Sequence, residues 1–467
     1  MRFQLLNYSI LLILIYLVVF LKIDTFHLRW WDESMFAVNT YEMAKNGHPF
    51  SLYFNGVIDI SNSKPPLTVW VQVAFTKLFG YNEVALRLPS AIAAALSIIM
   101  TFRFTQRRFG WVFAWLSALV LITSQAFIGF HSARTADSDS LLTLFTLAAN
   151  IYFFKYIEEG KSGQIFLFFL FISLGFCTKL YASLLFVPAY FFILIHHKKL
   201  KAFVFSGYFW SGVLLLLVTA VGIIILRDLD SPGYLREAIF KDAGRIFRVI
   251  EGHRHTWEYY IDNLIFTRYA FWFLIMIISS VLILINHKET KDRLFVDMLL
   301  LICSYFSIIS ISITKLEWYD IPLYPYFAIV SAYGLKTILE TRFDLSNLNR
   351  TTVIVLIVIF CYPYWLMFRK AQANTIPNNE KKSEASERFL FKRSNGKSNL
   401  EGIKVYNSNW EGSLIFYKYK FREKGENITI TRTADFSLKD KVLVSNDSLY
   451  DVLKSKYQFK LLDGNSA

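Results

Sequence analysis

Long apolar runs separated by short polar segments are the feature that most constrains how this chain can fold. A helix needs about 20 apolar residues to cross a bilayer at a rise of 1.5 Å per residue. Such runs recur from the N-terminus to about residue 370, and 54% of the 467 residues are hydrophobic. Within a bilayer only helices and closed barrels satisfy every backbone polar group. The sequence therefore predicts a polytopic α-helical membrane protein.

We expect about eleven membrane-spanning helices, and at most about 13. The expected spans are residues 5–23, 87–102, 111–130, 140–156, 165–178, 180–195, 202–226, 269–285, 294–313, 321–339 and 351–368. The first is predicted to be retained rather than cleaved, because no small-residue cleavage site follows it. A single helix over 165–195 would be about 46 Å long, against a hydrocarbon core of about 30 Å. Two short spans that break near Lys179 are therefore predicted.

The distribution of basic residues predicts which loops face inward. Lys and Arg gather in the loops 103–110, 157–164, 196–201, 286–293 and 340–350, which the positive-inside rule places in the cytoplasm. The net charge of +14 is then explained by anionic lipid rather than by nucleic acid. The outer segments become 24–86, 131–139, the turn at 179, 227–268, 314–320 and the tail. The three cysteines lie in apolar runs, so no disulfide framework is implied.

The chain divides into two expected domains. Residues 1–370 form the transmembrane domain, with large outer loops at 24–86 and 227–268, and residues 371–467 are polar and rich in Lys. The tail contains short alternating runs typical of strands, followed by one helical pattern: Ile403–Tyr406, Ile428–Thr433, Lys441–Val444 and Ser448–Tyr457. We expect it to be a small extracytoplasmic soluble α/β domain.

Unusual charged residues gather in the outer segments. They include the carboxylates Asp32, Glu33 and Asp139 and the cations Lys64, Arg134, Lys179 and Lys315. Taken singly, each has a structural explanation, such as helix capping or a lysine that snorkels to headgroups. Together on one face of the membrane they suit glycosyl transfer from a lipid phosphate. A carboxylate can act on the acceptor hydroxyl, and cations neutralise the phosphate that leaves.

Two other classes of protein compete with an enzyme. A transporter or lipid flippase would place ionisable residues near the middle of its spans, whereas here they lie at span ends. A non-catalytic scaffold for the tail would give no reason for outer carboxylates and lysines in this order. The pattern therefore favours the enzyme, with the transporter as the alternative.

Several short motifs follow one another in a recognisable order. They are Asp32-Glu33 with Tyr41–Ala44, Asn55-Gly56, Lys64-Pro65-Pro66-Leu67, Phe79-Gly80, Arg87-Leu88-Pro89-Ser90, Ala133-Arg134 with Asp139, Thr178-Lys179 with Pro188, His253 with Tyr259-Tyr260, and Lys315-Leu316 with Tyr319 and Pro322. By these motifs, roughly residues 25–330 resemble membrane glycosyltransferases of GT-C architecture. The resemblance is to bacterial relatives of the protein O-mannosyltransferases and to the lipid A aminoarabinose transferase.

The resemblance implies inverting transfer of a sugar from polyprenyl (undecaprenyl) phosphate to a lipid, glycan or protein acceptor. It places the reaction at the outer face of the bacterial cytoplasmic membrane. It implies that Asp32 is the leading catalytic carboxylate, assisted by Glu33 and Asp139. The remaining implied residues bind the donor phosphate (Lys64, Arg87, Arg134, Lys179 and Lys315) or position substrate (Tyr259 and Tyr319).

Three departures from the aminoarabinose transferase pattern argue against that specific activity. Met35 replaces a common Arg, and Leu180 replaces the Gly after the lysine. Ser63 stands where that pattern has a Glu that helps a His to bind a metal. His253 is the candidate metal ligand, but without the Glu we expect less dependence on a His-bound divalent ion. Glu33, Asp137 or His255 could supply a replacement ligand.

Overall fold

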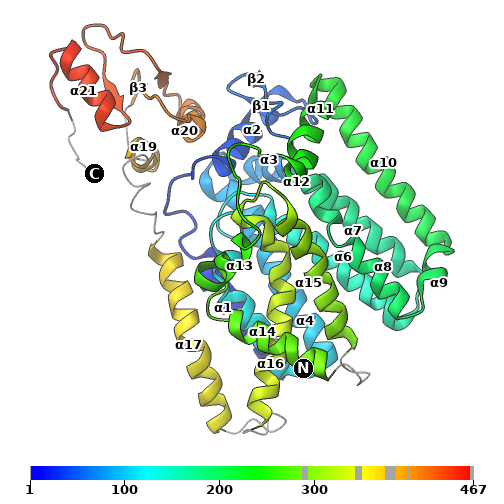
Figure 1. Cartoon of the computed structure of the whole chain (residues 1–467). Coiled ribbons are helices and arrows are strands. Elements are labelled where there is room, and N and C mark those ends of the chain that lie inside the picture. The colour runs from blue at the N-terminus through cyan, green and yellow to red at the C-terminus, as the bar shows by residue number, and fades with distance from the viewer. Residues whose placement is uncertain (1, 287–292, 342–349, 374–384, 397–399, 463–467) are drawn as a thin grey trace.

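The computed structural model describes residues 2–286, 293–341, 350–373, 385–396 and 400–462. The expected inner loops 286–293 and 340–350 lie almost entirely outside these described residues. Figure 1 shows a bundle of long helices, with a small mixed domain beyond the end of α17 (Arg350–Ala373). The fold class is confirmed: the chain is a multi-pass α-helical membrane protein.

Each expected span overlaps a helix. The main helices, besides α17, are α1 (Arg2–Ile15, continued by η1, Tyr16–Phe20), α4 (Glu83–Ile122), α6 (Asp139–Glu159), α7 (Gly163–Lys179), α8 (Val187–His196), α10 (Gly207–Asp230), α14 (Phe273–Ile285), α15 (Arg293–Ile311) and α16 (Tyr324–Glu340). Two expected spans share α4, which bends at Gly110 (φ 85°). Among the described residues, seven helical segments are long and apolar enough to cross a membrane.

The predicted break near Lys179 is present. Helix α7 ends at Lys179, a 3-10 turn (η2, Leu180–Leu184) follows, and α8 begins at Val187. Leu180 has a φ of 40°, a left-handed value that side chains other than Gly rarely adopt. This turn directs the end of α7 toward the outer segments.

The first outer segment is more ordered than a loop. It contains α2 (Asp32–Asn46), a two-stranded hairpin of β1 (Tyr53–Phe54) and β2 (Val57–Ile58), and α3 (Leu67–Phe79). Helix α3 is not among the expected spans, because its 13 residues would cover only about 20 Å. In Figure 1 these elements gather at one end of the bundle.

Short helical turns complete the segments between the long helices. They are α5 (Gln125–Ile128), α9 (Leu200–Val204), α11 (Tyr234–Ala238), η3 (Ile239–Ala243), α12 (Gly244–Phe247), α13 (Tyr259–Asn263), η4 (Leu264–Arg268) and η6 (Glu317–Leu323). All except α5 and α9 belong to the expected outer segments 227–268 and 314–320 or to their edges.

The tail contains a three-stranded parallel sheet with helices. Its elements are α19 (Ala385–Ser394), β3 (Lys404–Tyr406), α20 (Gly412–Arg422), β4 (Thr429–Thr431), β5 (Val442–Val444) and α21 (Asp447–Lys456). The strand order is β4-β3-β5, with Lys404 opposite both Thr429 and Val442. The strands fall within the alternating runs of the sequence, whereas α20 was not predicted.

Helix α20 packs the tail onto α2 and onto the start of α4. Buried apolar residues of the tail, including Leu414 and Phe416, share one core with Leu28 and Ala37. Lys420 forms a buried ion pair with Glu83, at 2.6 Å between Nζ and Oε2. The tail therefore packs against the end of the bundle formed by α2 and the start of α4.

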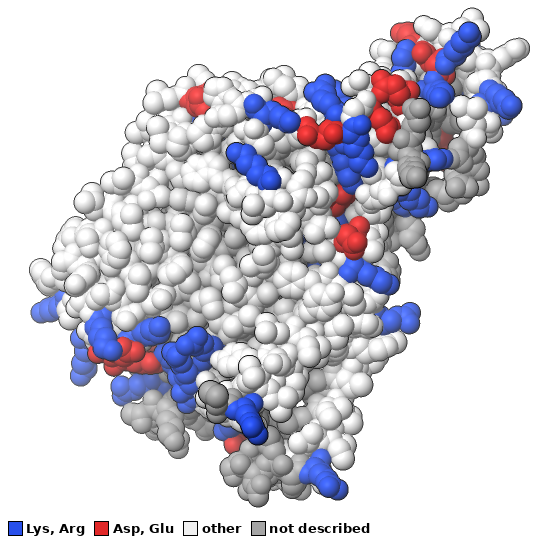
Figure 2. Space-filling model, turned by 180° about the vertical axis from the view of Figure 1, so that it is seen from behind, with Lys and Arg blue, Asp and Glu red and all other residues white. Residues whose placement is uncertain are grey.

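Charged residues mark the two ends of the molecule. Figure 2 shows Lys, Arg, Asp and Glu gathered near the tail and at the opposite end, with a broad band of other residues between them. A band of this kind is what a lipid-facing belt requires, because charged side chains are costly within the hydrocarbon.

Candidate functional site

The centre of the candidate site is an ion pair between Asp32 and Lys64. Asp32 is the first residue of α2, and its Oδ2 lies 2.8 Å from Lys64 Nζ. The segment that carries Lys64 is held by α10, because Arg227 donates to the carbonyls of Asn62 and Lys64. The Tyr234 hydroxyl donates to the neighbouring Ser63 carbonyl at 2.8 Å. The lysine therefore projects from a fixed backbone.

A second carboxylate–lysine pair joins the next two predicted residues. Asp139 begins α6 and Lys179 ends α7, and their side chains meet at 2.6 Å. The Lys179 ammonium also lies 5.1 Å from the ring centroid of Tyr319 in η6. Four predicted candidates thus form two pairs, and the predicted Tyr319 lies beside one of them.

His131 and Asp137 lie between the two pairs. His131 Nδ1 is 3.3 Å from Asp137 Oδ1 and 3.9 Å from Asp32 Oδ2. The imidazole stacks on Trp318, with 3.5 Å between ring centroids and 16° between planes. The sequence analysis assigns no role to His131. The feature that could have identified it is the grouping of His, Arg and Asp residues in the segment 131–139.

The charges of the site shift the pKa values of neighbouring groups. Burial opposes ionisation of Asp32, but Lys64 and His131 outweigh it and hold the pKa of that carboxyl well below its usual range. Burial likewise disfavours the charged forms of Lys64 and His131, yet Asp32 and Asp137 respectively raise their pKa values. The Asp32–Lys64 pair is therefore charged at neutral pH.

Two further charged residues near the site come from the loop after α10. Burial raises the pKa of Asp242, which also lies in the fields of Arg245, Lys64 and Lys179. The Arg245 guanidinium lies 5.8 Å from the Tyr319 centroid, and its buried Nε and one NH group have no hydrogen-bond partner among the described residues. Arginine forks match phosphate geometry, so Arg245 is a candidate that sequence reasoning missed.

Glu33 and Arg87 pair with each other rather than with the lysines of this group. Arg87 Nε lies 2.7 Å from Glu33 Oε1, and both side chains are 0% exposed. Arg87 also donates to the carbonyls of Ile23, Phe26 and His27, while Glu33 accepts from backbone amides, including that of Ala136. This pair fastens the first outer segment to α4 and to the loop before α6.

Arg134 and Lys315 are also engaged with backbone carbonyls. The Arg134 guanidinium donates to carbonyls at the end of the first helix and to that of Ala371. Lys315 Nζ donates to the carbonyls of Ser312 and His255, and burial lowers the pKa of its ammonium. Both are nearly fully buried, so the structure gives them anchoring contacts rather than a place beside Asp32.

The predicted residue His253 lies in the loop before α13, and Tyr259 is the first residue of α13. Tyr259 stacks on His255 with 4.0 Å between centroids, and the His253 carbonyl accepts from the Lys315 amide. Within the described residues, His253 belongs to no group of three potential metal ligands.

Three of the eight non-glycine residues with positive φ in the described part of the chain lie at the site. Trp31, His131 and Leu180 have φ values of 62°, 60° and 40°, and each lies at or next to a residue of the group. Such conformations cost about 1–3 kcal/mol each and persist only where the surroundings impose them. The strained positions fix Asp32, His131 and Lys179.

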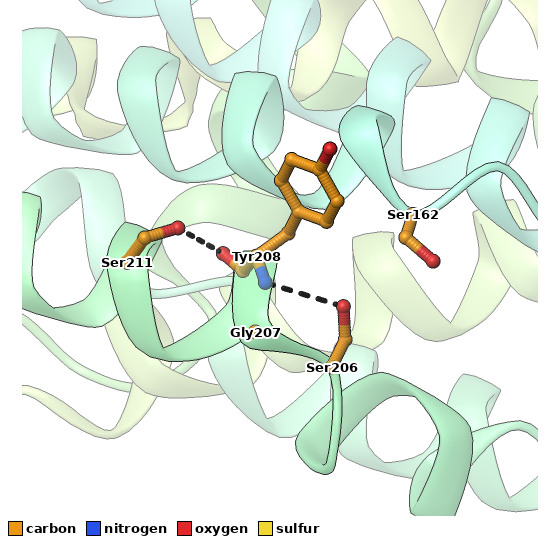
Figure 3. Close-up of a pocket in the computed structure, with 5 residues that line it drawn as sticks. All are labelled: Ser162, Ser206, Gly207, Tyr208 and Ser211. Atoms are coloured by element: carbon orange, nitrogen blue, oxygen red, sulfur yellow. Dashed lines mark hydrogen bonds between the residues drawn. The ribbon is translucent and has the colours of Figure 1, made fainter.

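A hollow of about 420 Å³ lies elsewhere, near the other end of α7. It is lined by Ser162, Ser206, Gly207, Tyr208 and Ser211, whose mutual hydrogen bonds are shown in Figure 3. None of its lining residues is charged, so it offers neither a carboxylate for the acceptor nor a cation for a phosphate. The ion-pair group remains the candidate site.

Residues 63–225 match the family model described as dolichyl-phosphate-mannose-protein mannosyltransferase. An uncharacterized protein of Aquifex aeolicus is 26% identical over 70% of this chain and 63% of its own length. The putative mannosyltransferase YkcB of Bacillus subtilis is 25% identical over 44% of this chain and 28% of its own length. The chain thus spans less than two thirds of the length of each of these relatives.

The solved structure of ArnT from Cupriavidus metallidurans bound to undecaprenyl phosphate superposes with a TM-score of 0.71. The superposition covers 99% of this chain and 96% of that one, at 15% sequence identity. Likeness at this identity shows the fold, and the matched family segment contains Lys64, Arg134, Asp139 and Lys179. The chain therefore has the fold of ArnT, and its residues 63–225 are similar to the mannosyltransferase family model.

Proposed function

We propose that this chain is an inverting glycosyltransferase that moves a sugar from a polyprenyl phosphate to a cell-envelope acceptor. The observation that carries the proposal is the meeting of two carboxylate–lysine pairs, Asp32–Lys64 and Asp139–Lys179, at one end of a GT-C bundle. The undecaprenyl phosphate bound to ArnT, a protein of the same fold, supports a lipid-phosphate donor. The acceptor is a lipid, a glycan or a protein.

Lys64, Lys179 and Arg245 would bind the donor phosphate. Lys179 and Arg245 both lie beside the Tyr319 ring, at 5.1 and 5.8 Å from its centroid. Arg245 has unpartnered buried N–H groups among the described residues, and each lysine can turn from its carboxylate to a phosphate oxygen. These cations would neutralise the charge that develops on the phosphate as the sugar departs.

Asp32 would act on the acceptor. In the reaction the acceptor oxygen attacks the anomeric carbon from the face opposite the phosphate, and the bond between that carbon and the phosphate oxygen breaks. Asp32 takes the acceptor proton, and polyprenyl phosphate leaves. Lys64 keeps Asp32 a weak base while the two are paired. When Lys64 turns to the donor phosphate, Asp32 becomes more basic, so donor binding activates the base.

The reaction would take place at the outer face of the bacterial cytoplasmic membrane. The basic loops at the opposite end of the bundle support this orientation. Reporter fusions at Lys161, in the loop between α6 and α7, and at Leu438, in the tail, test it. We expect Lys161 inside and Leu438 outside, and the same side for both would overturn the topology.

The test of the chemistry is transfer in proteoliposomes with a defined polyprenyl-phosphate sugar. Asp32→Asn keeps the shape but removes the charge, so turnover should fall by about 10²–10⁴-fold with donor binding retained. Lys64→Ala should weaken donor binding and turnover together, because phosphate is charged in both ground and transition states. Lys64→Arg should rescue in part. The exposed carboxylate Glu251, replaced by Gln, is the matched control.

Near-wild-type turnover by folded Asp32→Asn would exclude Asp32 as the catalytic carboxylate and make Asp139 the next candidate. If Asp32, Asp139 and Lys64 can all be replaced without loss, transport becomes the better explanation. The ionisable group lies at helix ends, which suits an enzyme at the membrane surface better than a transport path.

A further inference from the structure

The parallel sheet of the tail is covered on both faces. Val405 of β3 shares a buried core with Phe416 of α20, which follows β3 in the chain. The next residue, Tyr406, points to the other face and packs against Phe436, which contacts Tyr457 at the end of α21. The chain therefore leaves the adjacent strands β3 and β5 toward opposite faces. In parallel sheets, ligands bind outside the carboxyl ends of two such strands.

The carboxyl ends of β3 and β5 carry amide and hydroxyl side chains. The segment Asn407 to Asn409 follows β3, and Ser445 and Asn446 follow β5. The two ends are adjacent, because the Ser445 amide donates to the Tyr406 carbonyl at 3.2 Å. Ser445 is 3% exposed, and its hydroxyl has no hydrogen-bond partner among the described residues. Neither loop contains Lys, Arg or Gly, so these ends suit sugar hydroxyls better than a phosphate.

The loop after β3 also joins the tail to the first outer segment. Trp410 in this loop stacks between Trp31 and Phe54, with 5.0 Å between ring centroids on each side. Its Nε1 lies 3.3 Å from Ser34 Oγ in α2. A Cβ atom on Gly412 would lie 2.6 Å from both of these polar atoms, so a glycine is needed for this close approach. The aromatic stack is therefore held in place from both domains.

Trp31 presents an open aromatic face directly beside the proposed base. Trp410 covers one face of its ring, yet Trp31 is 62% exposed, so the opposite face is accessible. Trp31 immediately precedes Asp32 in the sequence. Sugar rings lay their C–H faces on aromatic rings, while their hydroxyls bond to amide and hydroxyl side chains. A sugar on Trp31 would have its hydroxyls near Asp32.

We propose that the acceptor is a neutral oligosaccharide of an envelope glycan, bound on Trp31 and in the crevice at the carboxyl ends of β3 and β5. A ligand that reaches both places is longer than one sugar unit. The tail is then the acceptor-binding domain of the enzyme. This inference rests on the proposed glycosyl transfer and names the class of its acceptor.

The test is binding of the purified full chain, without donor, to an array of defined oligosaccharides. The array holds di- to hexasaccharides of glucose, mannose, galactose, arabinose and N-acetylglucosamine. We expect binding to at least one series, with the longer members preferred. Trp31→Ala should weaken this binding at least about tenfold. Trp257→Ala is the matched control, because Trp257 is 64% exposed in a different outer segment. Binding to no series, or unchanged binding by Trp31→Ala, would overturn the proposal and leave the stack as a docking contact.

Ser445→Ala tests the crevice separately. The substitution removes a buried hydroxyl that has no partner among the described residues, so the unfolding midpoint should not fall. Binding of the oligosaccharide should nevertheless weaken by about three- to tenfold, because a hydrogen bond to the ligand is lost. Ser455→Ala, near the other end of α21, is its control. Unchanged binding by folded Ser445→Ala would exclude the crevice.

The array separates this inference from the proposed transfer, because it contains no donor. If no oligosaccharide binds but the proteoliposome assay shows transfer, the acceptor class is wrong and the transferase stands. If oligosaccharides bind as expected but no sugar is transferred from any polyprenyl phosphate, the transferase is wrong and the saccharide site stands.

Discussion

Asp32 and Glu33 are neighbours in the sequence but belong to regions with different surroundings. The Asp32–Lys64 pair remains partly open, with side chains 22% and 17% exposed, whereas Glu33 and Arg87 are completely buried. Glu33 and Arg87 also satisfy backbone groups around them, so their charges are used inside the protein. An ion pair whose members can exchange each other for substrate suits a catalytic role. An ion pair whose members cannot do so suits a structural role.

The strongest test of this contrast is Glu33→Gln. The substitution leaves Arg87 buried without its countercharge, so the free energy of unfolding should fall by about 3–5 kcal/mol. Asp32→Asn, one residue away, should lower the unfolding midpoint in detergent far less while reducing transfer. If the two variants are equally stable and Glu33→Gln is inactive, Glu33 has a catalytic role, and the proposed difference between Asp32 and Glu33 is wrong.

The same contrast separates two lysines. Lys179 faces Asp139 and Tyr319, so Lys179→Ala should lower turnover per folded molecule by about 10²–10³-fold, beyond any loss of stability from leaving Asp139 without its partner. Lys315 donates to two carbonyls, so Lys315→Met should instead destabilise the fold by about 1–3 kcal/mol. Turnover with matched unfolding curves distinguishes them. A larger loss of turnover per folded molecule in Lys315→Met would place Lys315 in the donor site.

Sequence reasoning named the residues of all three pairs, Glu33 and Arg87 included, but did not predict which of them pair with one another. Asp32, Lys64, Asp139 and Lys179 were predicted because charged residues at span ends need a reason to be there. Successive side chains on a helix point about 100° apart, so nothing in the sequence indicates which of Asp32 and Glu33 turns inward. That choice depends on Arg87, which lies 54 positions from Glu33 in the sequence.

The parts that were missed depend on tertiary contacts. Asp242 and Arg245 lie in short helical turns with no clear periodicity, and only the fold brings them near Tyr319. Helix α20 mixes Lys with Tyr and Phe, and its burial comes from docking on α2. The break at Lys179 was predicted because it follows from helix length and loop charge.

A smaller effect is expected where the tail docks on α2. It tests whether a buried contact contributes more to docking than an exposed one. The Tyr419 hydroxyl donates to Glu42 at 2.5 Å inside the interface between α20 and α2. Tyr419→Phe should weaken docking by about 1.5–3 kcal/mol, because a buried carboxylate loses a hydrogen bond. Hydrogen exchange of α20 measures the change. Tyr450→Phe, in α21 and away from this contact, is the matched control, and equal exchange in both variants would contradict the expectation.

The smallest effect is expected at the rim of the same interface. Lys45 and Glu423 pair at 2.9 Å with side chains 55% and 42% exposed. Water and salt screen such a pair, so Lys45→Ala should weaken docking by less than about 1 kcal/mol, and less still at high salt. Glu423 also keeps its bond from the Tyr41 hydroxyl, at 2.9 Å.

The pH dependence of this rim contact has a definite sign. Hydrogen bonds from Lys45 and Tyr41 lower the pKa of Glu423 below its usual value of about 4.5. A carboxylate whose pKa is lowered by folding stabilises the docked tail above its ordinary pKa, and the contribution disappears as the pH falls through the lowered value. Hydrogen exchange of α20 in Lys45→Ala should therefore differ from wild type at neutral pH and converge with it in acid. If Lys45→Ala instead loosens the tail more than Tyr419→Phe, exposed charges hold the two domains together and burial is not what distinguishes strong contacts from weak ones in this molecule.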